Sequence, residues 1–314
     1  MQHAIDRFSY FQGVLHLVGW VHAADARLKA LSLELPSGRQ YPLDFSRLPS
    51  PELAAMFGPI ALNSRFQASV RLDVSPAEVA DAKLLVTLKG REPVRIGGLG
   101  AAVGDPAHEL FARFHDLLRQ RPPGRLLEVG SRARSGVVRR DLAPAGWEYS
   151  GLDVMEGPNV DVVGDAHRLS SLYPKQHFDA IMACSVLEHL MMPWKFVVEL
   201  NRVLKPGAIG VFTTHQCWPL HDQPWDFWRF SDMAWTGLLN AATGFEIIAA
   251  RMGEPAFVVA AKLQPVTAFA EVPAGALASF VLFRKVSETT LDWPVELEAI
   301  TNTEYPSDVI AINS

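Results

Sequence analysis

The chain is poor in cysteine and has no long apolar run. Its 314 residues include only two cysteines, Cys184 and Cys217, and these form no C-x-x-C pair. The sequence therefore gives no sign of a disulfide framework, which suits a reducing compartment. No apolar stretch approaches about 18 residues, and no charged-then-apolar signal pattern begins the chain. We expect a soluble, cytoplasmic protein without stable membrane insertion.

An excess of positive charge is also missing. Lysine and arginine total 29 against 34 aspartates and glutamates, so the formal net charge is -5. Such a chain has no overall basic field for a phosphate backbone, and a nucleic-acid partner is disfavoured. Charged residues make up 20% and hydrophobic types 49%, which is typical of globular proteins. The length allows two domains, each with its own core.

Residues 1–96 show a period-two pattern in short runs separated by turn residues. The runs lie at 14–21, 28–35, 66–74 and 83–88. Alternation of this kind predicts antiparallel strands, and we expect a small all-β sandwich domain with one short helix near 51–57. The glycine-rich stretch 97–105 is interpreted as a linker.

Residues 106–314 alternate between strand and helix patterns. The expected helices begin at Pro106 or lie near 136–141, 194–204 and 232–242, and a turn at 205–207 is expected to close the third of these. The expected strands lie at 125–129, 148–153, 160–163, 178–184, 208–214 and 245–250, followed by an antiparallel last strand at 279–286, with 257–261 as a further strand-like run. This order predicts an α/β domain with a doubly wound, mostly parallel seven-stranded sheet. Ligands then bind beyond the carboxyl ends of the strands.

The loop after the first of these strands lacks the second glycine of a dinucleotide-binding fingerprint. Gly130 follows the strand, but Arg132 stands where a glycine would let the main chain touch a pyrophosphate. A nicotinamide oxidoreductase is therefore disfavoured. Acids instead mark three successive strand ends, at Glu128, Asp153 and Asp165. Carboxylates there accept hydrogen bonds from ribose hydroxyls and an adenine amine, so the pattern predicts an adenosine site without phosphates.

Five sequence blocks resemble class I S-adenosylmethionine-dependent methyltransferases, in the broad family that includes the ubiquinone-biosynthesis methyltransferases. The blocks are LLEVG at 126–130, GLD at 151–153, GDA at 164–166, FDAIMACSVLEHL at 178–190 and ELNRVLKPG at 199–207. Their order and spacing within 125–215 are more specific than any one block. The resemblance implies the fold expected above and S-adenosylmethionine as cofactor.

The resemblance also implies which residues bind the cofactor. Glu128 and Gly130 would hold the methionine end, with Ser131 beside them. Asp153 would bind the ribose. The adenine would lie at Asp165 and Ala166, and the sulfonium at Cys184 and Ser185. Arg132 or Arg134 either pairs with the methionine carboxylate or points into solvent, and His167 is expected on the surface of a helix that begins at Ala166.

An aromatic segment follows the fifth expected strand of this domain. Four of the eight tryptophans lie between Trp218 and Trp235. Flat rings beside His221, Asp222 and Asp226 suit an acceptor with apolar faces and hydroxyls, such as a sugar, although a loop that packs its own aromatic rings over the sheet edge explains them equally well. Residues 224–231 resemble a segment of methyltransferases encoded with polysaccharide assembly enzymes, in which Asp226 would pair with Arg229.

Methylation of a hydroxyl requires a proton acceptor near the methyl donor. His215, His221 and Asp226 are the candidate catalytic bases. We predict no metal site, because the spacing of His215, His221 and Asp222 matches no specific ligand pattern. Glu188 and His189 are expected to fix a helix start and a water network.

Residues 1–96 are loosely similar to β-sandwich modules attached to bacterial glycosyltransferases, through 18–21, the turn at 37–38 and 63–66. A module for dimerisation or packing explains them equally well, so a homo-oligomer through this module is one expectation. The sequence as a whole favours a methyltransferase that O-methylates a sugar hydroxyl of a glycan or glycan precursor. The alternatives are a small-molecule or quinone-type methyltransferase and a non-catalytic module that binds S-adenosylmethionine.

Overall fold

The computed structural model describes residues 1–11, 13–99, 106–134, 136–257 and 274–305. The chain divides into two compact units, Met1–Pro106 with Glu254–Ala276, and Ala107–Gly253 with Leu277–Ser314. The domain limits expected from the sequence (1–96, 97–105 and 106–314) stay a prediction. Most of the expected linker, 100–105, lies outside the described residues, as do residues 258–261 of the strand-like run.

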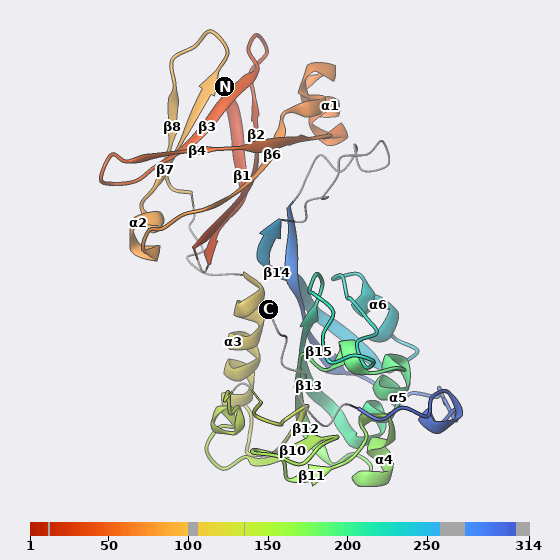
Figure 1. Cartoon of the computed structure of the whole chain (residues 1–314). Helices are drawn as coiled ribbons and strands as arrows, with labels where there is room; N and C mark the ends of the chain where they lie inside the picture. The colour runs from red at the N-terminus through yellow and green to blue at the C-terminus, as the bar shows by residue number, and fades with distance from the viewer. Residues whose placement is uncertain (12, 100–105, 135, 258–273, 306–314) are drawn as a thin grey trace. The chain divides into compact units, whose positions relative to one another are not determined.

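The first unit consists of two four-stranded antiparallel sheets around a shared core (Figure 1). One sheet has the order β1 (Gln2–Phe11), β2 (Val14–His22), β6 (Arg65–Arg71), β5 (Phe45–Leu48); the other has β4 (Gln40–Leu43), β3 (Leu28–Glu34), β7 (Lys83–Leu88), β8 (Val94–Ile96). Leu17 and Phe66 of the first sheet and Leu33 and Leu84 of the second are fully buried in the same cluster. The expected all-β architecture is confirmed.

Several elements of this unit carry no strong sequence pattern. The expected helix is α1 (Pro51–Phe57), but α2 (Pro76–Ala80) was not anticipated. Strand β1 was also missed, because Asp6 and Arg7 interrupt its alternation and it lies at the edge of its sheet. The short strands β4, β5 and β8 have too few residues for a periodic signal.

The second unit contains a seven-stranded sheet with the order expected of a doubly wound fold. The strands are, across the sheet, β11 (Val162–Val163), β10 (Glu148–Asp153), β9 (Arg125–Val129), β12 (Phe178–Cys184), β13 (Leu204–His215), β15 (Ala274–Lys285) and β14 (Phe245–Phe257). The first five run parallel to one another, and β15 runs antiparallel to β13. The expected fold class is confirmed. The chain crosses from one side of β9 to the other between β11 and β12, which opens a crevice at the carboxyl ends.

Helices cover both faces of this sheet (Figure 1). On one face, Phe114 and Leu118 of α3 (Pro106–Arg119) pack against Leu126 of β9. On the other face, α4 (Leu169–Leu172), α5 (Pro193–Val203) and α6 (Ala234–Leu238) bury apolar residues such as Phe196 and Trp235 against the strands. No helix in the described part of the chain is long and apolar enough to span a membrane.

Three expectations about this unit were wrong. The helix expected near 136–141 is absent; only a 3₁₀ helix, Arg140–Leu142, forms there, because Gly136 has a φ of +76° that no α-helix accommodates. Helix α6 is shorter than 232–242 and ends before Leu239. The expected turn at 205–207 belongs to β13.

Candidate functional site

A cavity of about 810 Å³ opens at the carboxyl ends of the parallel strands. Its wall includes a residue at or just after the end of each of these five strands: Gly130 after β9, Asp153 of β10, Asp165 after β11, Cys184 of β12 and His215 of β13. Ala166, Ser185 and His221 also line it. Among the expected site residues, Glu128, Ser131 and Asp226 do not line the wall. The strand order thus brings together side chains that are far apart in sequence.

Gly130 allows the first loop to turn sharply at the cavity wall. Its φ of +75° is one that L side chains rarely adopt. A Cβ at this position would lie 2.2 Å from Cγ2 of Val186. The space beside Gly130 is therefore taken by a protein side chain, and glycine is required for packing as well as for backbone conformation.

Glu128 lies behind the wall in a polar network. It is 1% exposed, accepts a hydrogen bond from the Tyr149 hydroxyl and is 3.6 Å from Nη1 of Arg139. Burial raises the pKa of the Glu128 carboxyl above its usual range, against the effect of these partners. Ser131 is also buried, and Asn159 donates to its carbonyl oxygen at 2.9 Å. Through this network, Glu128 supports Arg139, which does line the cavity.

Asp153 is fixed by the loop that follows β9. Its carboxylate accepts hydrogen bonds from the backbone N–H groups of Arg132, at 3.2 Å, and Met155, at 3.0 Å. The side chain of Arg132 lies alongside, with Nε 3.8 Å from Asp153 Oδ1. The side chain of Arg132 is thus close to the acid expected to bind ribose.

Asp165 is held by its neighbour His167. Met192 N–H donates to Nε2 of His167 at 3.2 Å, so Nδ1 carries the proton and donates to Oδ1 of Asp165 at 2.7 Å. Burial acts to raise the pKa of Asp165, but the hydrogen bonds from His167 outweigh it and the pKa lies below its usual range. The expected surface position of His167 was wrong: it is 1% exposed, because its ring links Asp165 to the start of α5.

Cys184 and Ser185 form the wall beyond β12. Burial raises the pKa of the Cys184 thiol to about 12, so this thiol is neutral and is not a nucleophile. Ser185 has a φ of +53°, unusual for a residue other than glycine. Its N–H donates to the carbonyl oxygen of Thr213 at 2.8 Å, which ties the ends of β12 and β13 together.

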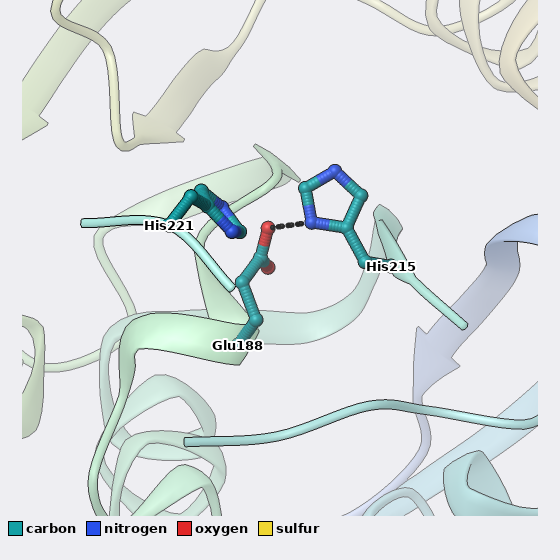
Figure 2. A group of neighbouring side chains, drawn as sticks. All are labelled: Glu188, His215 and His221. Carbon is teal, nitrogen blue, oxygen red and sulfur yellow. Dashed lines mark ion pairs between the residues drawn. The ribbon is translucent and has the colours of Figure 1, made fainter. Parts of the chain in front are cut away.

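The buried carboxylate of Glu188 meets two histidines at the other end of the cavity (Figure 2). Glu188 is 0% exposed, and its Oε1 lies 2.8 Å from Nδ1 of His215. Burial acts to raise the pKa of Glu188, but His215 and the hydroxyl of Thr214 outweigh it and lower the pKa. The ring of His221 lies 5.1 Å from that of His215, centroid to centroid.

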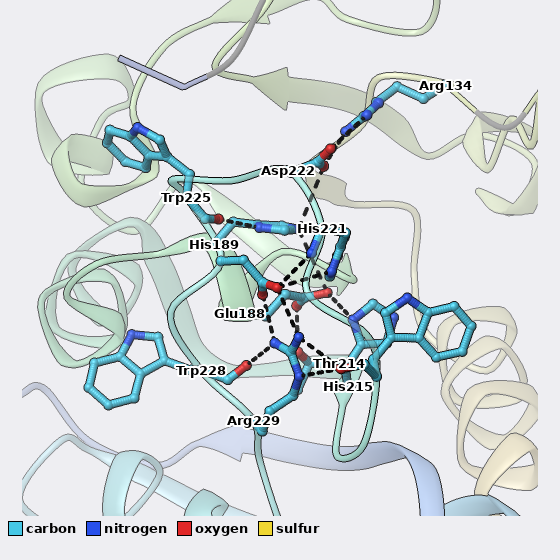
Figure 3. Close-up of polar contacts among 12 residues, drawn as sticks. Arg134, Glu188, His189, Thr214, His215, His221, Asp222, Trp225, Trp228 and Arg229 are labelled. Atoms are coloured by element: carbon cyan, nitrogen blue, oxygen red, sulfur yellow. Dashed lines mark hydrogen bonds and ion pairs between the residues drawn. The ribbon is translucent and has the colours of Figure 1, made fainter. Parts of the chain in front are cut away.

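His189 joins the same cluster (Figure 3). Its Nδ1 lies 2.5 Å from the carbonyl oxygen of Trp225, so Nδ1 carries a proton and donates it there. Nε2 is left facing Asp222, at 3.9 Å from Oδ2. A ring held in this way presents one nitrogen to the cavity in a fixed orientation.

Asp226 is a buried partner of Arg229. The guanidinium binds its carboxylate through Nη1–Oδ1 at 2.6 Å and Nη2–Oδ2 at 2.9 Å, and the backbone N–H of His221 donates to it at 2.9 Å. Burial opposes ionisation, but Arg229 and His221 outweigh it and lower the pKa of Asp226 to about 2. Such a carboxylate fixes the loop and is poorly suited to take up a proton.

The sequence did not single out Arg139 or Tyr305, and it favoured a supporting role for His189 over a catalytic one. All three line the cavity. Tyr305 donates from its hydroxyl to Oδ2 of Asp222 at 2.8 Å. The EH pair at 188–189 was a usable signal for His189, but nothing in the sequence around Tyr305 indicates a place beside Asp222, 83 residues away.

Part of the chain is similar to known proteins. Residues 105–251 match a family model described as a methyltransferase domain. Similar solved structures include a 1,6-didemethyltoxoflavin-N1-methyltransferase of Burkholderia thailandensis, solved with S-adenosylhomocysteine (14% identity, 58% of this chain and 78% of that chain, TM-score 0.42). Another is a putative methyltransferase of Bacillus halodurans (16% identity, 57% and 100%, TM-score 0.44). The search of curated proteins found no match.

The family model covers the strands β9 to β13, whose carboxyl ends form the cavity, and part of β14. This is the part of the chain that carries the five sequence blocks. The protein is therefore an enzyme that transfers methyl groups, with S-adenosylmethionine as its cofactor.

Proposed function

We propose that this enzyme transfers the methyl group of S-adenosylmethionine to a sugar hydroxyl of a glycan or glycan precursor. The observation that carries the proposal is the chemical difference between the two ends of one cavity. Carboxylates from β10 and β11 line one end, whereas three histidines and two tryptophans line the other. S-adenosylmethionine supplies an electrophilic methyl group on its sulfonium.

The first end fits the adenosine part of the cofactor. Asp153 ends β10, Asp165 follows the adjacent strand β11, and both residues line the cavity. Oδ1 of Asp165 is taken by His167, so Oδ2 remains as the acceptor for an amine. Two anionic acceptors suit ribose hydroxyls and an adenine amine and would repel a pyrophosphate.

Arg139 is the residue that we assign to the methionine carboxylate. It lines the cavity near Gly130, and its contact with Glu128 is long, at 3.6 Å. Arg134 is already bound to Asp222 by two hydrogen bonds. Arg139 is therefore the cation with the greater capacity for a new charged partner.

The second end fits a sugar ring. Trp218 and Trp225 line it, and the ring of Trp218 stacks on that of His215 at 4.9 Å with an interplanar angle of 8°. Flat aromatic faces beside imidazole donors and acceptors suit a ring with apolar faces and equatorial hydroxyls.

We assign the role of proton acceptor to His189. Its Nδ1–H is committed to Trp225, so in the neutral ring Nε2 holds a lone pair on the cavity side. His215 and His221 also line the cavity and remain the alternatives expected from the sequence; Asp226 is the least suited because Arg229 neutralises it. Most of the rate would come from holding the acceptor oxygen against the methyl group.

The proposal includes a cytoplasmic role in polysaccharide biosynthesis. Both cysteines are free thiols, which suits a reducing compartment. The all-β unit would act as a module of its own, as its loose similarity to modules attached to glycosyltransferases suggests, and would be a place for oligomer contacts.

A direct assay tests the proposed acceptor class. The purified enzyme is incubated with S-adenosylmethionine and a panel of glycans, nucleotide sugars, quinols and small alcohols, and methylated products are identified by mass spectrometry. We expect methyl ethers of sugars only, and we expect His189→Ala to lower kcat by at least about a hundredfold while cofactor affinity is kept. Methylation of quinols alone would contradict the glycan acceptor.

A further inference from the structure

The acceptor end of the cavity brings three possible metal ligands to one point. The ligand atoms of Glu188, His215 and His221 all lie within 4.8 Å of one another (Figure 2). They come from three segments: a 3₁₀ helix (Leu187–His189), the last residue of β13 and the loop after it. We propose that these three side chains bind a divalent transition-metal ion.

The Glu188 carboxylate creates the need for a positive charge at this point. It is 0% exposed, and a carboxylate removed from water is costly unless a cation or several donors compensate it. The nearby guanidinium of Arg229 is bound to Asp226 through both of its terminal nitrogens. A dication bound to Glu188 and His215 would compensate this carboxylate directly.

The geometry of the pair Glu188–His215 suits two ligands of one ion. Oε1 of Glu188 and Nδ1 of His215 are 2.8 Å apart, but within the described residues neither atom makes a well-aligned hydrogen bond. Ligands at about 2.0 to 2.2 Å from an ion and at right angles to each other are separated by about 3 Å. The other oxygen of Glu188 accepts the Thr214 hydroxyl, which fixes the carboxylate.

The third ligand would be Nε2 of His221, the nitrogen of this ring that is left after Nδ1 has its own partners. Its Nδ1 lies 3.2 Å from the carbonyl oxygen of Pro219 and 3.2 Å from Oδ2 of Asp226, so the proton is on Nδ1. A histidine whose second nitrogen donates to a carboxylate or carbonyl is the usual arrangement at metal sites. Trp218, stacked on His215, holds the other imidazole in place.

The ligand set selects the class of ion. Two imidazoles and one carboxylate favour Zn²⁺, Fe²⁺, Co²⁺ or Mn²⁺ over Mg²⁺ and Ca²⁺, which prefer oxygen ligands only. Three protein ligands leave positions open for water or for a hydroxyl oxygen. An overlapping group, His189, His221 and Asp226, is less suitable because Arg229 occupies the Asp226 carboxylate.

The site could not be found from sequence spacing, because Glu188 lies on a different segment from His215 and His221. The trio considered there was His215, His221 and Asp222, but Asp222 is bound to Arg134. Glu188, from the block at 178–190, takes the place of Asp222. The inference depends on these side chains alone and does not require a sugar acceptor or a particular reaction.

Titration with Co²⁺ tests the site without any activity assay. The full-length protein, free of a histidine tag and treated with a chelator, is titrated while the visible absorption of Co²⁺ is recorded. We expect one Co²⁺ per chain. Glu188→Gln and His215→Asn should each weaken binding by at least about tenfold. His177→Asn is the matched control, because His177 precedes β12 and lies outside the cavity.

Binding of S-adenosylhomocysteine to each variant, measured by calorimetry, checks that the cofactor site is folded. If the variants at the buried positions fail to fold, His221→Asn decides the question, since His221 is the most exposed of the three ligands, at 22%. Absence of saturable Co²⁺ binding to the wild-type protein would overturn the proposal. So would equal Co²⁺ affinity of His221→Asn and His177→Asn.

Discussion

Arg134 and Asp222 form a two-point ion pair between the loop that follows β9 and the aromatic segment that follows β13 (Figure 3). Nη1 lies 2.5 Å from Oδ2 and Nη2 lies 3.0 Å from Oδ1. The hydroxyl of Tyr305 donates to the same carboxylate. The hydrogen bond from Arg134 is the main cause that lowers the pKa of Asp222 to about 2, and the hydrogen bond from Tyr305 adds to it. The two ends of the cavity are therefore linked by one ionised carboxylate.

We predict that Asp222→Asn raises the acceptor KM by about tenfold and changes cofactor affinity much less. The loss of a bidentate charged contact corresponds to about 1 to 2 kcal/mol. Steady-state kinetics with both substrates varied measures it. Asp116→Asn is the control, because Asp116 forms only an exposed pair with Arg119 on α3. An unchanged acceptor KM would show that the Arg134–Asp222 ion pair does not position the aromatic segment that follows β13.

We predict that Gly130→Ala destabilises the protein more than Gly136→Ala does. Both glycines have φ near +75°, so both substitutions introduce similar backbone strain of about 1 kcal/mol. Only at Gly130 would the new Cβ also collide, with Val186; at Gly136 nothing lies within 4 Å. Urea denaturation should show a further loss of about 2 kcal/mol for Gly130→Ala. Equal losses would mean that Val186 moves aside freely.

We predict that Asp226 stabilises the fold above about pH 4 and loses this effect as the pH falls toward 2. Its folded pKa, about 2, is below the ordinary value of 3.8, so the ionised form is favoured by folding. Asp226→Asn should lower the free energy of unfolding by about 2 kcal/mol at pH 7. Denaturation at pH 7, 4 and 3 should show this difference shrinking. A difference independent of pH would contradict the ionic role of Asp226.

The central strands of the methyltransferase domain were predictable because their signal is local. Three expected strands, 125–129, 148–153 and 178–184, coincide with β9, β10 and β12. The strands β9 and β12 are short apolar runs, as expected of strands buried on both faces, and β10 contains the GLD block at 151–153. Because the bounds of these strands were predicted correctly, Glu128, Asp153 and Cys184 were also placed correctly at the ends of their strands.

The features that were missed depend on contacts between distant residues. His167 has no sequence pattern that distinguishes a surface histidine from one that links Asp165 to Met192. The 136–141 helix was expected because a helix usually follows the first strand, but Arg134 and Gly136 have loop conformations fixed by Asp222 and by a positive φ. Tertiary contacts overrode the local preference in both cases.

The most direct test of the cofactor site is the affinity of S-adenosylhomocysteine for Asp153→Ala, measured by isothermal titration calorimetry beside Asp116→Ala. Asp153 is the acid that lines the cavity at the end of β10, where the ribose is expected. Loss of its charged hydrogen bonds should weaken binding by about ten- to a hundredfold, while Asp116→Ala keeps the wild-type affinity. Equal affinities of the two variants would contradict the placement of the ribose at Asp153.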